Sequence, residues 1–233
     1  MKKNNWYYLN SGIHDGSFNM NCDEFLLDGL INDHIELPIL RVYGWSQPTL
    51  SIGANQKIDL AQSNPSFEFS SVPFVKRITG GMAVLHGGLD DELTYSLVIK
   101  TEKNFKKIYN EISKTLIYFL ENYGLSGVFG YSNKNYFTEF NCFNSKTPAD
   151  IVVNDVKVIG SAQYQKRGHV LQHGSIRLDL ISGFLGESVD FFKAIESLKS
   201  AFQVKLNIDF IDYCISEFDM KNINNKNAIL SLA

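Results

Sequence analysis

Residues 141–176, NCFNSKTPADIVVNDVKVIGSAQYQKRGHVLQHGSI, decide the fold of this chain. Two apolar runs, 151–153 and 156–159, flank Asn154 and Asp155. Asn and Asp tolerate positive φ, so they suit a tight turn between two strands. The pattern predicts a β-hairpin. We expect it to end at residues 160–162, Gly-Ser-Ala, where small side chains would let the backbone approach a ligand closely.

Lys157 is the unusual residue of this hairpin, because its neighbours in the strand are apolar. Strand alternation places Lys157 on one face and Val156 and Val158 on the other. Spacing alone leaves two interpretations open. Lys157 either faces solvent on an ordinary hairpin, or holds a positive charge over a pocket, near a developing negative charge or a cysteine thiol.

The chain contains three cysteines, at positions 22, 142 and 214. Their odd number, wide spacing and lack of a C-x-x-C pair indicate free thiols in the cytoplasm and no metal or redox pair. Cys22 and Cys214 lie in apolar segments and are predicted to be small core residues. Cys142 has polar neighbours, so it is the cysteine that we expect to be reactive.

Hydrophobic periodicity predicts the other elements. Strands in hairpins beside scattered helices indicate an α+β fold, and 233 residues fit one domain, 1–233. We expect strands over 6–10, 39–45, 49–52, 93–100 and 170–180, the last broken at Gly174; helices over 19–32, capped within Ser17–Asn19, over 103–123 and over 188–204; a short helix and loop over 57–73; a loop over 131–141; a turn or bulge over 164–169; and a strand and a final helix toward Ala233.

Composition excludes several classes of function. The formal net charge is -3, so no overall basic field favours nucleic acid or membrane as a partner. The sequence has no run of 18 apolar residues that predicts a membrane span, and no apolar stretch follows the first two lysines as in a secretory signal. We therefore expect a cytoplasmic protein.

We also assign expected roles to two further short segments, at residues 23–24 and 80–81. Asp23 and Glu24 are adjacent and would point about 100° apart on a helix, so they are interpreted as helix-dipole and capping residues and not as an acid/base couple. Gly80 and Gly81 follow a predicted strand and would expose backbone N–H groups to the polar head of a ligand. His86 is either a general base or a structural histidine.

These motifs together resemble the biotin/lipoate protein ligase superfamily. Residues 75–86, VKRITGGMAVLH, look like its Arg-x-Thr/Ser-Gly-Gly-x-Ala-Val-x-His signature, and residues 157–163, KVIGSAQ, look like its Lys-x-x-Gly-Ser-Ala block. Within the superfamily the pattern is similar to the cysteine-dependent octanoyltransferases, with Cys142-Phe143 fifteen residues before Lys157 and Gln-His-Gly-Ser at 172–175. The resemblance runs from Trp6 to about Leu180.

The resemblance implies a class II synthetase-like catalytic domain of mixed or antiparallel sheets packed with helices, without a large C-terminal accessory domain. It implies that Cys142 is the nucleophile and that Lys157 is the cation that favours its thiolate. It also implies substrate-binding residues in four segments, namely Arg41 and Tyr43; Arg77, Thr79, Gly80, Gly81 and His86; Gly160, Ser161 and Ala162; and His173 and Gly174.

The implied reaction has two steps. Cys142 attacks the octanoyl thioester of an acyl carrier protein, and a lysine of a lipoyl domain or of the glycine cleavage H protein then takes the octanoyl group as an amide. The thioester is already activated, so no cofactor is required. Basic residues around the site would suit an acidic carrier; they are Lys76, Arg77, Lys157, Lys166, Arg167 and Arg177.

Two alternatives stay open. An ATP-dependent lipoate-protein ligase shares both glycine blocks, uses ATP and Mg, and needs no cysteine. Cys142-Phe143 and the run ELTYS at 92–96 favour the transferase over it. A non-catalytic binder of acyl chains is the second alternative, and the presence of both Cys142 and Lys157 argues against it.

Overall fold

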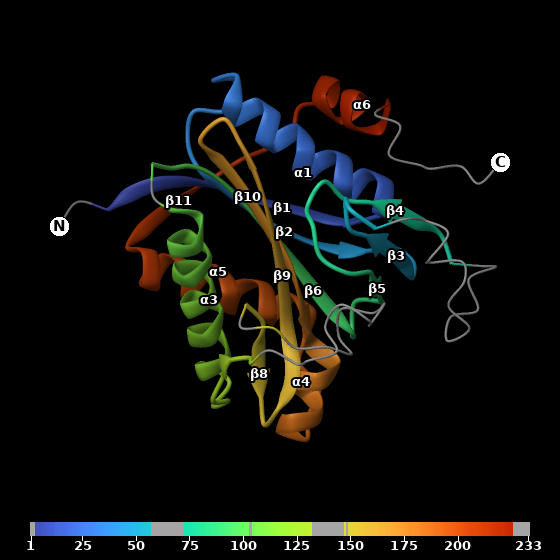
Figure 1. Ribbon diagram of the computed structural model, residues 1–233, viewed down its shortest axis with the longest axis vertical. Coiled ribbons are helices and arrows are strands. Elements are labelled where there is room, and N and C mark those ends of the chain that lie inside the picture. Colours follow the sequence, from blue (N-terminus) through green and yellow to red (C-terminus); the bar gives the residue numbers. More distant parts are fainter. Residues whose placement is uncertain (1–2, 57–71, 103, 132–146, 148, 226–233) are drawn as a thin grey trace.

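Two β-sheets form the centre of the molecule. The computed structural model describes residues 3–56, 72–102, 104–131, 147 and 149–225. Within them, one mixed sheet of eight strands has the order β11-β1-β2-β6-β10-β9-β8-β7, and a small sheet has the order β4-β3-β5 (Figure 1). The large sheet consists of β11 (Ile208–Asp212), β1 (Asn4–His14), β2 (Ile39–Trp45), β6 (Glu92–Lys100), β10 (His169–Arg177), β9 (Val156–Lys166), β8 (Ile151–Val153) and β7 (Val128–Phe129). The small sheet consists of β4 (Phe74–Lys76), β3 (Thr49–Ile52) and β5 (Val84–His86).

Strand direction differs between the two halves of the large sheet. β1 runs parallel to both β11 and β2, whereas every pair from β2 onward to β7 is antiparallel. In the small sheet β3 pairs parallel with β4 and antiparallel with β5. Mixed sheets with helices on both faces confirm the predicted α+β class.

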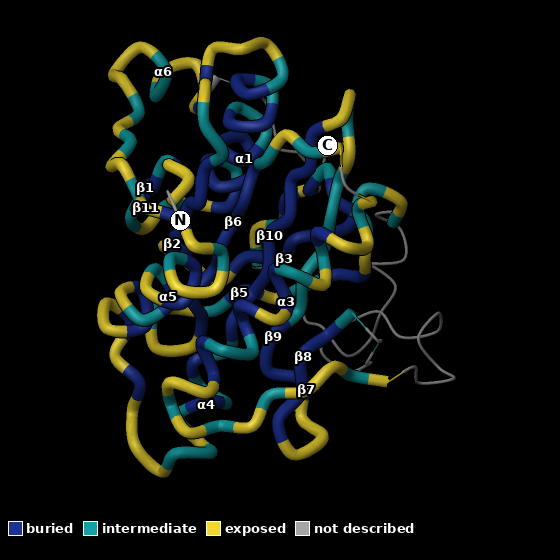
Figure 2. Tube along the Cα trace, turned by 90° about the vertical axis from the view of Figure 1, so that its left-hand side faces the viewer, coloured by how far each residue is buried: buried dark blue, intermediate teal, exposed yellow. Residues whose placement is uncertain are grey.

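Helices cover both faces of the large sheet, so the side chains of its central strands are buried on either face. Along β2, Leu40 packs into the core beneath α3 (Phe105–Glu121) and α5 (Phe191–Leu206), whereas its neighbour Ile39 packs into the core beneath α1 (Gly16–Ile31). Alternating side chains therefore serve opposite layers, as strand geometry requires. Figure 1 shows α4 (Leu178–Leu185) on the side of α3 and α5, and α6 (Glu217–Asn225) on the side of α1. In Figure 2 the central strands are dark blue and α6 lies at the exposed rim.

The predicted hairpin is confirmed at its turn and wrong at its far end. Asn154 and Asp155 have φ values of 46° and 66°, so both occupy the left-handed region of a primed turn. β9 does not end at residues 160–162, because its pairing with β10 continues from Ile159 to Lys166. The turn expected over 164–169 is therefore confined to Arg167 and Gly168, which have φ values of 51° and 74°.

The strand expected over 170–180 is shorter than predicted and is not broken at Gly174. β10 ends at Arg177, and the apolar residues that follow form α4. Leu178 and Ile181 are three residues apart and both buried, which is helical spacing. Gly186, with φ 72°, terminates this helix.

Helix α1 begins earlier than expected, because Asp15 and not a residue within 17–19 is its N-cap. The Asp15 carboxylate accepts a hydrogen bond of 2.8 Å from the backbone N–H of Phe18. The long helix expected over 103–123 is confirmed as α3, and the helix expected over 188–204 is confirmed as α5. Strand β11 and helix α6 match the strand and helix expected near the C-terminus.

Of the two cysteines predicted to lie in the core, one is buried and the other is not. Cys22 is fully buried on α1, as expected, but Cys214 is exposed in the segment between β11 and α6, so its assignment to the core is wrong. Cys142 and the loop expected over 131–141 lie outside the described residues, except for Tyr131, as does the helix expected over 57–73, except for residues 72 and 73. Among the described residues, no helix has both the length and the apolar character needed to cross a membrane.

Candidate active site

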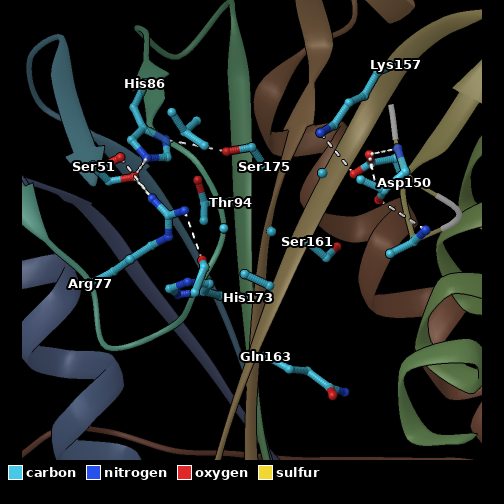
Figure 3. A pocket seen from close by; sticks show the side chains of 18 of the residues that line it. Ser51, Arg77, His86, Thr94, Asp150, Lys157, Ser161, Gln163, His173 and Ser175 are labelled. Carbon is cyan, nitrogen blue, oxygen red and sulfur yellow. Dashed lines mark hydrogen bonds and ion pairs between the residues drawn. The ribbon is translucent and has the colours of Figure 1, made fainter. Parts of the chain in front are cut away.

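A cavity of about 260 Å³ lies where the two sheets meet, and it gathers most of the predicted site residues. Residues of β2, β3, β5, β6, β9 and β10 line it, together with Met20 of α1 and Tyr109 of α3. Figure 3 shows two polar poles, with Lys157 and Asp150 on one side and Ser51, Arg77 and His86 on the other. The predicted residues that line the cavity are Tyr43, Arg77, Gly80, Gly81, His86, Lys157, Gly160, Ser161, Ala162, His173 and Gly174.

Lys157 is a buried cation. Its side chain is 1% exposed, and its Nζ lies 2.9 Å from Oδ1 of Asp150, whose side chain is 5% exposed. The other carboxylate oxygen of Asp150 accepts hydrogen bonds from the backbone N–H and the hydroxyl of Thr147, at 2.7 and 3.0 Å. The interpretation of Lys157 as a solvent-facing residue is therefore wrong, and its charge lies at the wall of the cavity.

His86 forms the centre of the opposite pole. Its Nδ1 lies 2.7 Å from Oε1 of Glu92, its Nε2 lies 2.8 Å from Oγ of Ser51, and its ring stacks on that of Trp45 with centroids 3.7 Å apart. Burial raises the pKa of Glu92, but its electrostatic interaction with His86 and the hydrogen bonds to the carboxylate more than offset this, so its pKa is lowered overall.

Arg77 fastens the Gly80-Gly81 loop to strand β3. One terminal nitrogen donates to the backbone carbonyl of Ser51 at 2.8 Å, and the other donates to the carbonyls of Gly80 and Met82 at 3.1 and 2.6 Å. Gly81 has φ 92°, and a Cβ on Gly53 would lie 2.0 Å from the Gly81 carbonyl oxygen. Glycine is needed at both positions for this close approach.

Behind the cavity, Asp23 joins α1, β2 and β10 through a buried network. It lies 2.7 Å from a terminal nitrogen of Arg41 and 2.9 Å from Nδ1 of His173, while Nε2 of His173 lies 2.7 Å from the hydroxyl of Thr79. Burial raises the pKa of Asp23, yet the charge of Arg41 and the hydrogen bond from His173 outweigh it, and the pKa is lowered. The capping interpretation of Asp23 is wrong, because its partners belong to other elements.

Two predicted substrate-binding residues do not line the cavity. Arg41 is fully buried, and its guanidinium also donates to the side chain of Asn19 at 2.7 Å. Thr79 is fully buried against His173. In this structure both residues support the wall of the cavity from behind.

A second group of hydroxyls holds strand β9 in place. The Tyr95 hydroxyl lies 2.8 Å from Oγ of Ser161, and the Tyr109 hydroxyl donates to the carbonyls of Ser161 and Ala149 at 2.9 and 3.2 Å. Burial raises the pKa of Tyr95 to about 12, so this hydroxyl stays protonated at neutral pH. A Cβ on Gly174 would lie 2.6 Å from Oγ of Ser161, which explains a glycine in the middle of β10.

The predicted basic region is not one patch. Arg77 and Lys157 are buried, Lys166 pairs with Asp28 at 2.9 Å, and Arg177 pairs with Asp179. Lys166 is also nine residues from Lys157 along β9, a separation of about 30 Å in a strand. Three of the six charges, those of Lys157, Lys166 and Arg177, therefore each face a carboxylate.

Sequence reasoning missed several residues of the site. Ser51 carried no signal beyond its place in an alternating strand, and Glu92, Thr94 and Ser175 were noted only as parts of family motifs. Asp150 could have been found, because an acidic residue directly before a buried apolar strand needs a partner. In the described part of the chain, no group of three or more His, Cys, Asp or Glu side chains is arranged to hold a metal ion.

A mixed sheet is covered by helices on both faces, and one cavity in it is lined by a buried ammonium and by a histidine that a buried glutamate holds from behind, which is the architecture of an α+β catalytic domain. A family model described as the lipoyl protein ligase A/B catalytic domain matches residues 15–218. The chain belongs to this family.

Curated relatives and solved structures agree with this assignment. The octanoyltransferase LipM of Bacillus subtilis is 36% identical over 193 residues, which cover 77% of this chain and 68% of that protein. LipM of Halalkalibacterium halodurans is 37% identical, covering 75% and 66%, and LipM of Carboxydothermus hydrogenoformans is 34% identical, covering 94% and 82%. The chain thus spans about two thirds of the length of the first two relatives.

Two solved structures share the fold. The protein Ta0514 of T. acidophilum with bound lipoic acid superposes with a TM-score of 0.71, and a lipoate-protein ligase A bound with ATP superposes with a TM-score of 0.67. Each is 19% identical, and each match covers 94% of this chain and 92% of the other. At this identity the likeness extends to the fold alone.

Proposed function

We propose that this chain is an octanoyltransferase, which moves an octanoyl group from the thioester of an acyl carrier protein to a lysine of a lipoyl-accepting domain through an acyl-cysteine at Cys142. The observation that carries the proposal is the buried Lys157 ammonium, fixed by Asp150 at the wall of the cavity. The relatives named octanoyltransferase support the same reaction at 34–37% identity.

The chemistry of a cysteine nucleophile explains why such a cation is useful. A cysteine thiol with an ordinary pKa near 8.5 is ionised to only a few per cent at neutral pH, and the thiolate is the reactive form. A fixed positive charge stabilises the thiolate relative to the thiol. Thr147, which also lines the cavity, follows Cys142 by five residues, and five residues span at most about 18 Å. A connection of this length keeps Cys142 within about 18 Å of Thr147, which is compatible with a thiol that reaches the cavity.

The cavity also suits an acyl chain. Met20, Tyr43, Trp45 and Val84 supply apolar surface on the side of β2 and β5. Each buried methylene contributes about 0.8 kcal/mol, so an eight-carbon chain gains several kcal/mol from such surroundings. Because the donor is already a thioester, transfer requires no ATP.

The donor in this proposal is octanoyl-acyl carrier protein, and the acceptor is a lipoyl domain or the glycine cleavage H protein, in the cytoplasm. The runner-up is an ATP-dependent lipoate ligase with Mg. Its support is the fold shared with the lipoate ligases at 19% identity, whereas the relatives of higher identity carry the transferase name.

A transfer assay separates the two activities. The chain is incubated with an acceptor domain and either octanoyl-acyl carrier protein without ATP, or free lipoate with ATP and Mg. The proposal expects modification of the acceptor lysine in the first mixture. Modification in the second mixture alone would make the chain a ligase.

A further inference from the structure

We propose that Ser51, His86 and Glu92 form a proton relay, which takes up the proton that the acceptor lysine sheds as its amine becomes an amide. This inference rests on the proposed octanoyl transfer and deepens it. It is carried by a continuous chain of hydrogen bonds, from the cavity wall at Ser51 to the buried carboxylate of Glu92, with heavy-atom distances of 2.8 and 2.7 Å. Figure 3 shows the Ser51 end of this chain beside Arg77.

The direction of each hydrogen bond follows from the donors around Glu92. Oε1 of Glu92 accepts from the hydroxyls of Thr94 and Ser175, at 2.8 and 2.6 Å, as well as facing His86. The Thr94 hydroxyl itself accepts from the indole N–H of Trp45 at 2.9 Å, so its own proton points to Glu92. With these two hydroxyl donors and a lowered pKa, Glu92 is a carboxylate, which can only accept from the ring nitrogen that faces it. Nδ1 of His86 therefore carries the proton, and Nε2 is free to accept one.

Arg77 and His86 together orient the hydroxyl of Ser51. A terminal nitrogen of Arg77 lies 3.1 Å from Oγ of Ser51 and donates to it. Because an Nε2 without a proton can only accept, the Ser51 hydroxyl is the donor in its 2.8 Å hydrogen bond to His86. One lone pair of Oγ is left toward the cavity. This is the arrangement of a base oriented by a carboxylate and extended by one hydroxyl.

Among the described residues of the opposite pole, the acceptor is the Asp150 carboxylate, which already faces Lys157 and accepts two hydrogen bonds from Thr147. The carboxylate of Asp150 stabilises Lys157 in its ammonium form, which carries no lone pair. Lys157 can stabilise a thiolate in this form, but it cannot take up a proton. Both poles line the same cavity of about 260 Å³, so a group bound in it is exposed to both.

Aminolysis of the acyl-cysteine releases one proton from the acceptor nitrogen. The neutral amine of the acceptor lysine attacks the octanoyl carbonyl of the acyl-cysteine, the C–N bond forms and the C–S bond breaks, with the electron pair leaving on Sγ as thiolate. The proton shed by the nitrogen passes to Oγ of Ser51 while the Ser51 proton passes to Nε2 of His86. Glu92 stabilises the resulting imidazolium, which later releases its proton to solvent.

The test measures the two half-reactions separately. Acyl-enzyme formation is followed by intact mass with octanoyl-acyl carrier protein, and aminolysis is followed by mixing the isolated acyl-enzyme with acceptor domain. The variants are His86→Ala, Ser51→Ala and Glu92→Gln. The matched control is Ser113→Ala, which removes a buried hydroxyl of α3 that has no hydrogen-bond partner among the described residues and does not line the cavity.

The relay predicts that His86→Ala slows aminolysis by about 10²–10⁴-fold, the contribution of a general base, and slows acylation at least tenfold less. Added imidazole restores aminolysis in His86→Ala, because the deleted ring leaves a site stacked on Trp45. Ser51→Ala and Glu92→Gln slow aminolysis in the same selective way, and Ser113→Ala does not.

Three results would overturn the relay. Aminolysis unchanged in His86→Ala is one, and equal loss of both half-reactions without imidazole rescue is another. The third is an octanoyl ester on Ser51, which would make that residue a nucleophile. Failure of the wild-type chain to form any acyl-enzyme would refute the proposed transfer and the relay with it, and is distinguishable from these.

Discussion

Nζ of Lys157 and Oδ1 of Asp150 lie 2.9 Å apart in a region where both side chains are at most 5% exposed. This pair fixes a positive charge at the wall of the cavity. It also joins strand β9 to the segment before β8, since Asp150 directly precedes that strand. A buried pair of this kind is costly to break, because removing one partner leaves a charge without its counterion.

The two halves of this pair have unequal effects on stability. Asp150→Asn removes the charge that faces a buried ammonium, and we expect it to lower the free energy of unfolding by about 3–5 kcal/mol. Lys157→Met leaves a carboxylate that still accepts two hydrogen bonds from Thr147, so its cost is smaller. Urea unfolding of both variants and of the double variant checks this order. A larger loss in Lys157→Met than in Asp150→Asn would show that the lysine is the better solvated partner.

The pKa of Asp23 makes stability depend on pH in the acid range. Its folded-state pKa is lowered, so its contribution is present above the ordinary Asp value of about 3.9 and is lost as pH falls through the folded-state pKa. We expect the urea midpoint of the wild-type chain to fall below pH 4. Asp23→Asn is less stable at pH 7, and its difference from the wild type shrinks as pH falls. A difference that stays constant from pH 7 to pH 3 contradicts this account.

Gly53 allows the loop of Gly80 and Gly81 to lie against β3. A Cβ at Gly53 would lie 2.0 Å from the Gly81 carbonyl oxygen, so Gly53→Ala must displace the loop. We expect a loss of about 1–3 kcal/mol, as for other overpacked sites, together with a loss of acyl transfer. Thermal unfolding and the transfer assay measure the two effects.

The control for this variant is Gly183→Ala on helix α4. No atom lies within 4 Å of a Cβ at Gly183, which is exposed on that helix, so alanine should stabilise it by about 0.5–1 kcal/mol. Equal behaviour of Gly53→Ala and Gly183→Ala would mean that the loop accommodates the extra carbon.

Sequence patterns predicted the elements whose signal is local. The turn at Asn154 and Asp155 follows from the φ values that these residues tolerate, and α3 follows from a long apolar stripe of helical period. Helix α4 was missed because its eight residues directly continue a strand and Arg177, at its N-cap, makes no side-chain capping hydrogen bond. A short apolar run after a strand is compatible both with a longer strand and with a new helix.

The site was predictable only in part, because its partners are far apart in the sequence. The resemblance placed His86, Arg77 and Lys157 together, and the cavity contains all three. No local pattern pairs Asp23 with His173, which lies 150 residues further along the chain. Likewise, burial of Lys157 depends on how β8 and β9 pack, which alternation along one strand does not determine.

The most direct test of the account is the intact mass of the chain after mixing with octanoyl-acyl carrier protein, without ATP and without acceptor. The account predicts one added octanoyl group, lost in Cys142→Ala and retained in Cys214→Ala, which removes an exposed thiol elsewhere. An adduct that persists in Cys142→Ala, or no adduct on the wild-type chain, would contradict the acyl-cysteine at the centre of the account.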